Sequence, residues 1–153
     1  MTRLEVGAKA PSFNLMNQDG VKVGLGDFAG RRLVVYFYPA DDTPGCTREA
    51  CQFNDELANF KDLDVDVLGV SPDLAKQHVA FRAKYALTFD LLSDPDRKVM
   101  ARYGAYGEKM LYGKKVVGVI RSTFVVGTTG RIEHAWYGVK TDGHAARVLA
   151  SLT

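Results

Sequence analysis

Two cysteines follow a strongly apolar run of the chain, and their setting suggests nucleophilic thiol chemistry at the start of a helix. Cys46 and Cys51 are the only cysteines, and residues 33–38 before them fit a strand buried on both faces. Thr43 is a suitable N-cap, and Pro44 suits the first helical position. Cys46 then lies in the first turn, where free N–H groups and the helix dipole favour an anion. The nucleophilic thiolate should be favoured there.

The spacing of the two cysteines has a geometric consequence. Cys46 falls on the apolar stripe of the predicted helix, which is formed by Ala50, Phe53, Leu57 and Phe60. In an intact helix Cys51 lies roughly 140° further around the axis, and the two Cα atoms are roughly 8.6 Å apart. A disulfide needs a Cα separation below about 7 Å. We therefore predict that the two cysteines can react with each other only if the first turns of the helix unwind.

The pattern Pro39-x-x-x-Thr43-x-x-Cys46 resembles the active-site signature of the peroxiredoxins, thiol peroxidases with a thioredoxin-like fold. Cys51 resembles the resolving cysteine of the bacterioferritin-comigratory (peroxiredoxin Q) subfamily. One departure is Tyr106, where many relatives are expected to have tryptophan. Most of the chain shares the resemblance, which continues through the segments 67–71, 91–94, 106–109 and 121–124.

This resemblance implies an atypical 2-Cys peroxiredoxin that reduces hydrogen peroxide and small organic hydroperoxides. Cys46 would attack the peroxide and become a sulfenic acid. Cys51 would resolve it to an intramolecular disulfide, which thioredoxin or a similar dithiol would reduce. As N-cap, Thr43 could accept the N–H of Cys46 and donate its hydroxyl proton to the sulfur.

A cation should accompany the thiolate and the peroxide oxygens, and a guanidinium is suited because it is always charged and offers several donors. The resemblance implies that this cation is Arg121, at the start of a predicted strand. Without the resemblance, Arg31 and Arg48 are also candidates. Glu49 shares the helix face of Cys46. Its carboxylate would hinder the thiolate unless an arginine binds it, so Glu49 is either an orienting residue or a solvated charge.

Three further residues complete the candidate site. Pro39 would shield the sulfur from water, or would simply end a strand. Tyr38 either lines the substrate pocket or belongs to the core, and Gly45 is assigned to the same pocket. The three histidines are far from both cysteines in sequence and are expected to be ordinary surface or core residues.

Two other function classes compete with a peroxidase. A thiol–disulfide oxidoreductase of the same fold would use Cys-x-x-Cys, and the wider spacing here disfavours it. A zinc-binding or structural domain would need more ligands than two isolated thiolates provide. We therefore expect no metal and no cofactor.

Length and composition limit the number of domains and the classes of binding partner. The 153 residues suit one domain spanning 1–153, with 46% hydrophobic and 25% charged residues. A net charge of +2 gives no reason to expect nucleic-acid or membrane binding. No stretch approaches the ~20 apolar residues of a membrane-spanning helix. We expect a cytoplasmic protein that is a monomer or at most a weak dimer.

The elements that position the cysteines follow from periodicity and turn residues. A hairpin pairs residues 9–16 with 21–23, and the buried strand 33–38 leads into a cysteine helix ending near Lys61. Residues 65–70 form the next strand and complete a βαβ unit. The later expectations are a helix opened by Ser71 and Pro72 that continues through Tyr85, a strand at 89–92, a helix at 93–104, a loop at 104–118, a hairpin of 120–126 with 132–137, and a helix capped by Asp142. This order predicts an α/β, thioredoxin-like fold with a central mixed sheet flanked by helices and an N-terminal β-hairpin extension.

Overall fold

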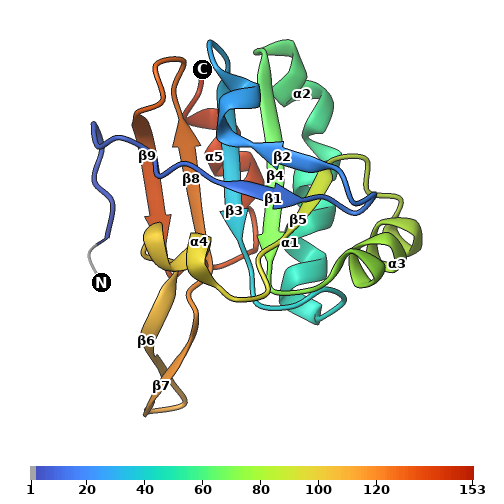
Figure 1. The fold of residues 1–153 in the computed structure, drawn as a ribbon, viewed down its shortest axis with the longest axis vertical. Coiled ribbons are helices and arrows are strands. Elements are labelled where there is room, and N and C mark those ends of the chain that lie inside the picture. The colour runs from blue at the N-terminus through green and yellow to red at the C-terminus, as the bar shows by residue number, and fades with distance from the viewer. Residues whose placement is uncertain (1–2) are drawn as a thin grey trace.

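The computed structural model describes residues 3–153, so the first two residues of the predicted domain 1–153 lie outside the described residues. It contains a seven-stranded mixed sheet flanked by helices (Figure 1). The strands of this sheet are β1 (Asn14–Met16), β2 (Lys22–Gly24), β3 (Arg32–Phe37), β4 (Val65–Ser71), β5 (Asp90–Ser93), β8 (Ser122–Val126) and β9 (Ile132–Tyr137). They lie in the order β2-β1-β5-β4-β3-β8-β9. The predicted mixed sheet and the N-terminal hairpin of β1 and β2 are confirmed.

Strand β3 lies inside the sheet, parallel to β4 and antiparallel to β8. Its side chains alternate between two hydrophobic clusters, because successive residues of a strand point to opposite faces. Val34 and Tyr36 belong to one cluster, whereas Val35 and Phe37 belong to the other. All four side chains are fully buried, which explains why the sequence of β3 is apolar without alternation.

Helices cover both faces of the sheet. They are α1 (Pro44–Asp55), α2 (Leu57–Asp62), α3 (Ala75–Tyr85), α4 (Lys98–Arg102) and α5 (His144–Ala150), with a short 3-10 turn at Leu25–Phe28. Phe53 of α1, Phe60 of α2 and Val148 of α5 pack in one cluster with Val34. Met100 of α4 packs on the other face. The predicted single cysteine helix is thus divided at Glu56, the boundary residue between α1 and α2.

The prediction that Ser71 and Pro72 open a helix is wrong. Ser71 is the last residue of β4, where it pairs with Ser93 of β5, and α3 begins at Ala75. The Ser71 hydroxyl is buried and donates to Asp73 Oδ2 over 2.7 Å. Pairing between strands therefore overrides the local preference of Ser-Pro for a helix start.

The prediction of a loop over residues 104–118 is also wrong. This segment contains β6 (Tyr106–Leu111) and most of β7 (Lys114–Val119), which form a separate antiparallel hairpin. Tyr112 and Gly113 connect the strands with positive φ angles of 51° and 78°, as in a type I′ turn. Most side chains of the hairpin are exposed or half-buried, so its sequence lacks the alternation that marks a half-buried strand.

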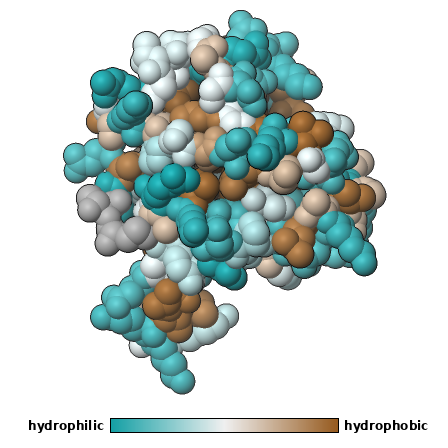
Figure 2. Space-filling view, in the orientation of Figure 1, coloured by the Kyte–Doolittle hydropathy of each residue, from teal (hydrophilic) through white to brown (hydrophobic). Residues whose placement is uncertain are grey.

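The hairpin projects away from the body of the molecule (Figure 1). Figure 2 shows an apolar patch on it, and the hairpin exposes the apolar side chains of Met110, Leu111 and Val117. Within residues 3–153, no helix combines the length and apolarity that a bilayer crossing requires.

Candidate active site

Cys46 lies in the first turn of α1. This helix starts after the loop that follows the carboxyl end of β3 (Figure 1). Thr43 is the N-cap residue with extended backbone angles, and Pro44 is the first helical residue, both as predicted. Cys46 is only 1% exposed and belongs to the hydrophobic cluster of Tyr38 and Phe53. The fold therefore holds the sulfur at a helix N-terminus while shielding it from bulk water.

Arg121 is the arginine that reaches this sulfur. Its Nη2 donates to Cys46 Sγ over 3.3 Å, and its Nη1 donates to Glu49 Oε1 over 2.7 Å. The pairing of Phe37 in β3 with Ser122 in β8 sets this geometry, because it brings the residue before β8 next to the end of β3. The structure thus joins three predicted site residues that are up to 75 positions apart.

The other two candidate arginines lie elsewhere. Arg31 forms a bidentate ion pair with Asp66, from Nε to Oδ2 over 2.8 Å and from Nη2 to Oδ1 over 3.3 Å. Its side chain is largely exposed. Arg48 is exposed on α1.

Glu49 is a buried carboxylate rather than a solvated helix charge. It is 1% exposed, and its Oε2 has no hydrogen-bond partner among residues 3–153. Burial raises its pKa from 4.5 to about 7, although the charge of Arg121 and its hydrogen bond act in the opposite direction. Burial alone would lower the pKa of Arg121, but the negative charges of Glu49 and Cys46 outweigh burial and raise it. Arg121 therefore stays charged between Glu49 and Cys46.

The hydroxyl of Thr43 does not make the predicted contacts. It donates to the carbonyl of Ala40 over 2.9 Å, and no side-chain cap bond is formed to α1. The prediction that it accepts the N–H of Cys46 and donates to the sulfur is therefore wrong for this conformation. The carbonyl of Ala40, in the preceding loop, accepts the hydrogen bond of the hydroxyl instead.

Gly45 is next to the guanidinium. A Cβ atom at this position would lie 3.2 Å from Arg121 Nη2, which is tighter than ordinary van der Waals contact. Tyr38 is fully buried, and its hydroxyl donates to Asp41 Oδ1 over 2.6 Å. Pro39 is half-buried in the loop that follows β3.

Cys51 is half-buried further along α1, and both cysteines are free thiols. Burial raises the pKa of Cys51, and the charge of Asp55 adds to this. The helix is intact from Pro44 to Asp55. This is the arrangement in which helix geometry keeps the two sulfurs from bonding.

Sequence analysis missed two residues next to the site. Asp41 lies in the loop before Cys46, and its Oδ2 is 2.6 Å from Nδ1 of the fully buried His78. The only sequence signal is that Asp41 is an acidic residue inside the Pro39–Cys46 pattern. Nothing in the sequence connects it with His78, 37 residues away.

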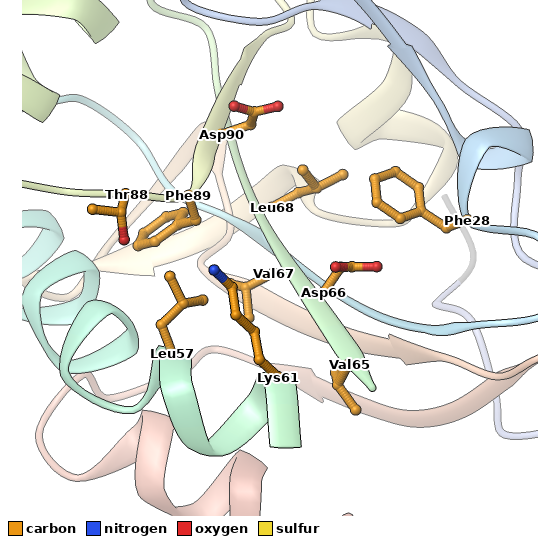
Figure 3. A pocket seen from close by; sticks show the side chains of 10 residues that line it. All are labelled: Phe28, Leu57, Lys61, Val65, Asp66, Val67, Leu68, Thr88, Phe89 and Asp90. Carbon is orange, nitrogen blue, oxygen red and sulfur yellow. The ribbon is translucent and has the colours of Figure 1, made fainter. Parts of the chain in front are cut away.

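The hollow shown in Figure 3, with a volume of about 220 Å³, is not part of this site. Its walls include Lys61 and the first half of β4, whereas Cys46 follows the carboxyl end of the parallel strand β3. The hollow contains none of the predicted site residues. Within residues 3–153, no group of three or more His, Cys, Asp or Glu side chains could hold a metal ion.

Known proteins resemble this chain in sequence and in fold. Residues 6–135 match the AhpC/TSA family. The chain is 53% identical over 152 residues to a putative peroxiredoxin of Mycobacterium tuberculosis, covering 99% of this chain and 97% of the relative. The structure of Xylella fastidiosa PrxQ superposes with a TM-score of 0.92 at 38% identity, covering 99% of this chain and 97% of that one.

A second solved structure adds a stated activity. It is that of the Xanthomonas campestris bacterioferritin comigratory protein, described by its alkyl peroxide reduction activity. It superposes with a TM-score of 0.90 at 39% identity and covers 97% of both chains. The protein described here therefore belongs to the AhpC/TSA family of thiol peroxidases, as a peroxiredoxin of the bacterioferritin-comigratory, or peroxiredoxin Q, type.

Proposed function

We propose that residues 1–153 act as one thioredoxin-like domain that reduces hydrogen peroxide and small organic hydroperoxides through Cys46. The thiolate attacks the terminal oxygen of the peroxide, so that an S–O bond forms while the O–O bond breaks. Cys46 becomes a sulfenic acid, and the leaving oxygen takes up a proton from solvent to give water or an alcohol. The observation that carries this proposal is the 3.3 Å contact between Arg121 Nη2 and Cys46 Sγ at a helix N-terminus.

Arg121 stabilises the negative charge that passes from the sulfur to the leaving oxygen, as preorganised donors do in other enzymes. Glu49 orients the guanidinium through its 2.7 Å ion pair with Nη1. The Thr43 hydroxyl donates its hydrogen bond to the carbonyl of Ala40, so its oxygen remains able to accept a hydrogen bond from the O–H of an incoming peroxide. Tyr38, Pro39 and Gly45 form the surrounding wall, and Gly45 leaves room for the guanidinium.

Cys51 completes an atypical 2-Cys cycle. The first turns of α1 unwind, and the thiolate of Cys51 attacks the sulfenic sulfur of Cys46, so that an S–S bond forms while the S–O bond breaks. The leaving hydroxide takes up a proton from solvent to give water. A dithiol protein of the thioredoxin type then reduces this disulfide by exchange and becomes a disulfide itself. We propose that the enzyme works in the cytoplasm as a monomer or at most a weak dimer. It needs no metal or cofactor and binds neither nucleic acid nor membranes.

Two cysteine variants test this cycle. Cys46→Ser should abolish peroxide consumption in stopped-flow measurements, and full activity in this variant would rule out the assignment. Cys51→Ser should give one turnover to a sulfenic acid, visible by mass spectrometry of the intact protein. It should also lose cycling supported by thioredoxin, unless a small thiol replaces Cys51. Full thioredoxin-supported cycling without Cys51 would contradict the proposed resolving step.

A further inference from the structure

The loop between β3 and α1 is held by a buried contact that the peroxidase chemistry does not use. Asp41 in this loop accepts the Tyr38 hydroxyl at Oδ1 over 2.6 Å. Its Oδ2 lies 2.6 Å from Nδ1 of His78 in α3, and the other ring nitrogen of His78, Nε2, lies 3.0 Å from the carbonyl of Leu92 in β5. The side chains of His78 and Asp41 are 0% and 5% exposed. We call these four groups the loop anchor.

The partners of His78 fix where its protons are. A carbonyl oxygen can only accept, so the contact with Leu92 requires a proton on Nε2. The other ring nitrogen faces a carboxylate oxygen at hydrogen-bond distance, so a second proton must lie between Nδ1 and Oδ2. The contact is therefore either an imidazolium–carboxylate pair or its proton-transferred form. The imidazolium–carboxylate form is a charge-assisted hydrogen bond, which is stronger than one between neutral groups, and bulk water does not screen it because both side chains are buried.

The loop is also held through its backbone. The N–H of Asp41 donates to Asp73 Oδ2 over 2.8 Å, and the Ser71 hydroxyl donates to the same oxygen. These contacts connect the loop to β4, α3 and β5 and not to α1. Beside the loop lies a hollow of about 220 Å³, whose walls include Asp41, Asp73 and Lys84, so a released loop has space to move.

From this geometry we propose that His78 is a positioning residue, which through Asp41 holds the loop before Cys46 and so sets how readily the start of α1 unwinds. The inference deepens the proposed function, since it rests on unwinding as the step that brings Cys51 to Cys46. With the loop anchor closed, α1 stays intact and Cys46 remains beside Arg121. With it open, the loop and the first turn of α1 can move together.

The loop anchor would then decide the fate of the oxidised sulfur. While α1 is intact, a second hydroperoxide can transfer one oxygen to the sulfenic acid, which gives a sulfinic acid and an alcohol or water. After unwinding, Cys51 forms the disulfide instead. A weaker anchor should therefore favour the disulfide over the sulfinic acid and should slow the first reaction of Cys46 with peroxide.

The test uses the full-length reduced protein and the variant His78→Asn, which is too short to join Asp41 to Leu92. Hydrogen exchange of residues 44–49 should become about tenfold faster or more, the change expected from losing one charged hydrogen bond, while β3 and β4 keep their protection. At a fixed dose of hydrogen peroxide, mass spectrometry should find less sulfinic acid and more disulfide. His134→Asn is the matched control, because it makes the same substitution on β9, where His134 stacks on Trp136 outside the loop anchor. It should leave both readouts unchanged.

A second variant keeps the inference testable if His78→Asn does not fold. Asp41→Asn keeps the shape of the loop anchor but removes its charge, and it should shift both readouts in the same direction. Unchanged exchange at residues 44–49 in a folded variant would overturn the inference, as would faster exchange with an unchanged ratio of sulfinic acid to disulfide. Peroxidase activity that persists in Cys46→Ser would instead overturn the proposed function, so the two failures are distinguishable.

Discussion

The buried carboxyl of Glu49 should make the free energy of unfolding depend on pH, and the variant Glu49→Gln should lack this contribution. Burial raises its pKa from 4.5 to about 7. Between these two pH values the unfolded chain has released the proton while the folded protein keeps it. The free energy of unfolding therefore falls as the pH rises through this window. At about 1.4 kcal/mol per pH unit, the contribution of Glu49 reaches roughly 3 kcal/mol.

His144 masks this effect in the wild-type protein. Burial lowers its pKa from 6.5 to about 4, and the charges of Arg147 and Arg121 add to the shift. Between pH 4 and 6.5 His144 is protonated in the unfolded chain but not in the folded protein. Its contribution to the free energy of unfolding therefore rises with pH and opposes the decrease caused by Glu49. The quantity to measure is therefore the difference between the two proteins. The stability of Glu49→Gln relative to wild type should increase by roughly 3 kcal/mol from pH 4.5 to 7.

The assay is urea unfolding of the reduced proteins at half-unit pH intervals, followed by fluorescence of Trp136, the single tryptophan of the chain. Glu133→Gln is the matched control, because Glu133 is an exposed glutamate on β9. A stability difference between Glu49→Gln and wild type that does not change with pH would refute the reasoning. The same pH-dependent difference in Glu133→Gln would refute it as well.

Three further predictions concern the site. Arg121→Lys should lower the second-order rate constant with hydrogen peroxide roughly 10- to 100-fold in stopped flow, because a single ammonium cannot serve both Glu49 and Cys46 and one charged hydrogen bond is lost; an equal loss in Arg48→Lys would contradict this. Gly45→Ala should slow the same reaction by about tenfold, since its Cβ displaces the guanidinium, and an unchanged rate would show that Arg121 adapts. Oxidation to the Cys46–Cys51 disulfide should remove amide protection across residues 44–54, and unchanged hydrogen exchange there would argue against unwinding.

Local features of this protein could be predicted from its sequence. The helix start at Thr43 and Pro44 depends on backbone preferences of neighbouring residues, so it could be placed correctly without any tertiary information. The same holds for the apolar strand β3 and for the hairpin of β8 and β9. The other site residues follow mainly from the family resemblance, because the sequence pattern alone allows three arginines as the cation beside the Cys46 sulfur.

Non-local contacts decided the rest. Arg121 reaches Cys46 because β8 pairs with β3, and the buried setting of Glu49 follows from that same packing. Pairing with β5 extends β4 through Ser71, although Ser-Pro locally favours a helix start. The sequence thus determined where a reactive thiol could be held at a helix start, since backbone geometry within a few residues governs it. Only the tertiary structure decided which charges surround the sulfur, because strand pairing joins residues that are far apart in the chain.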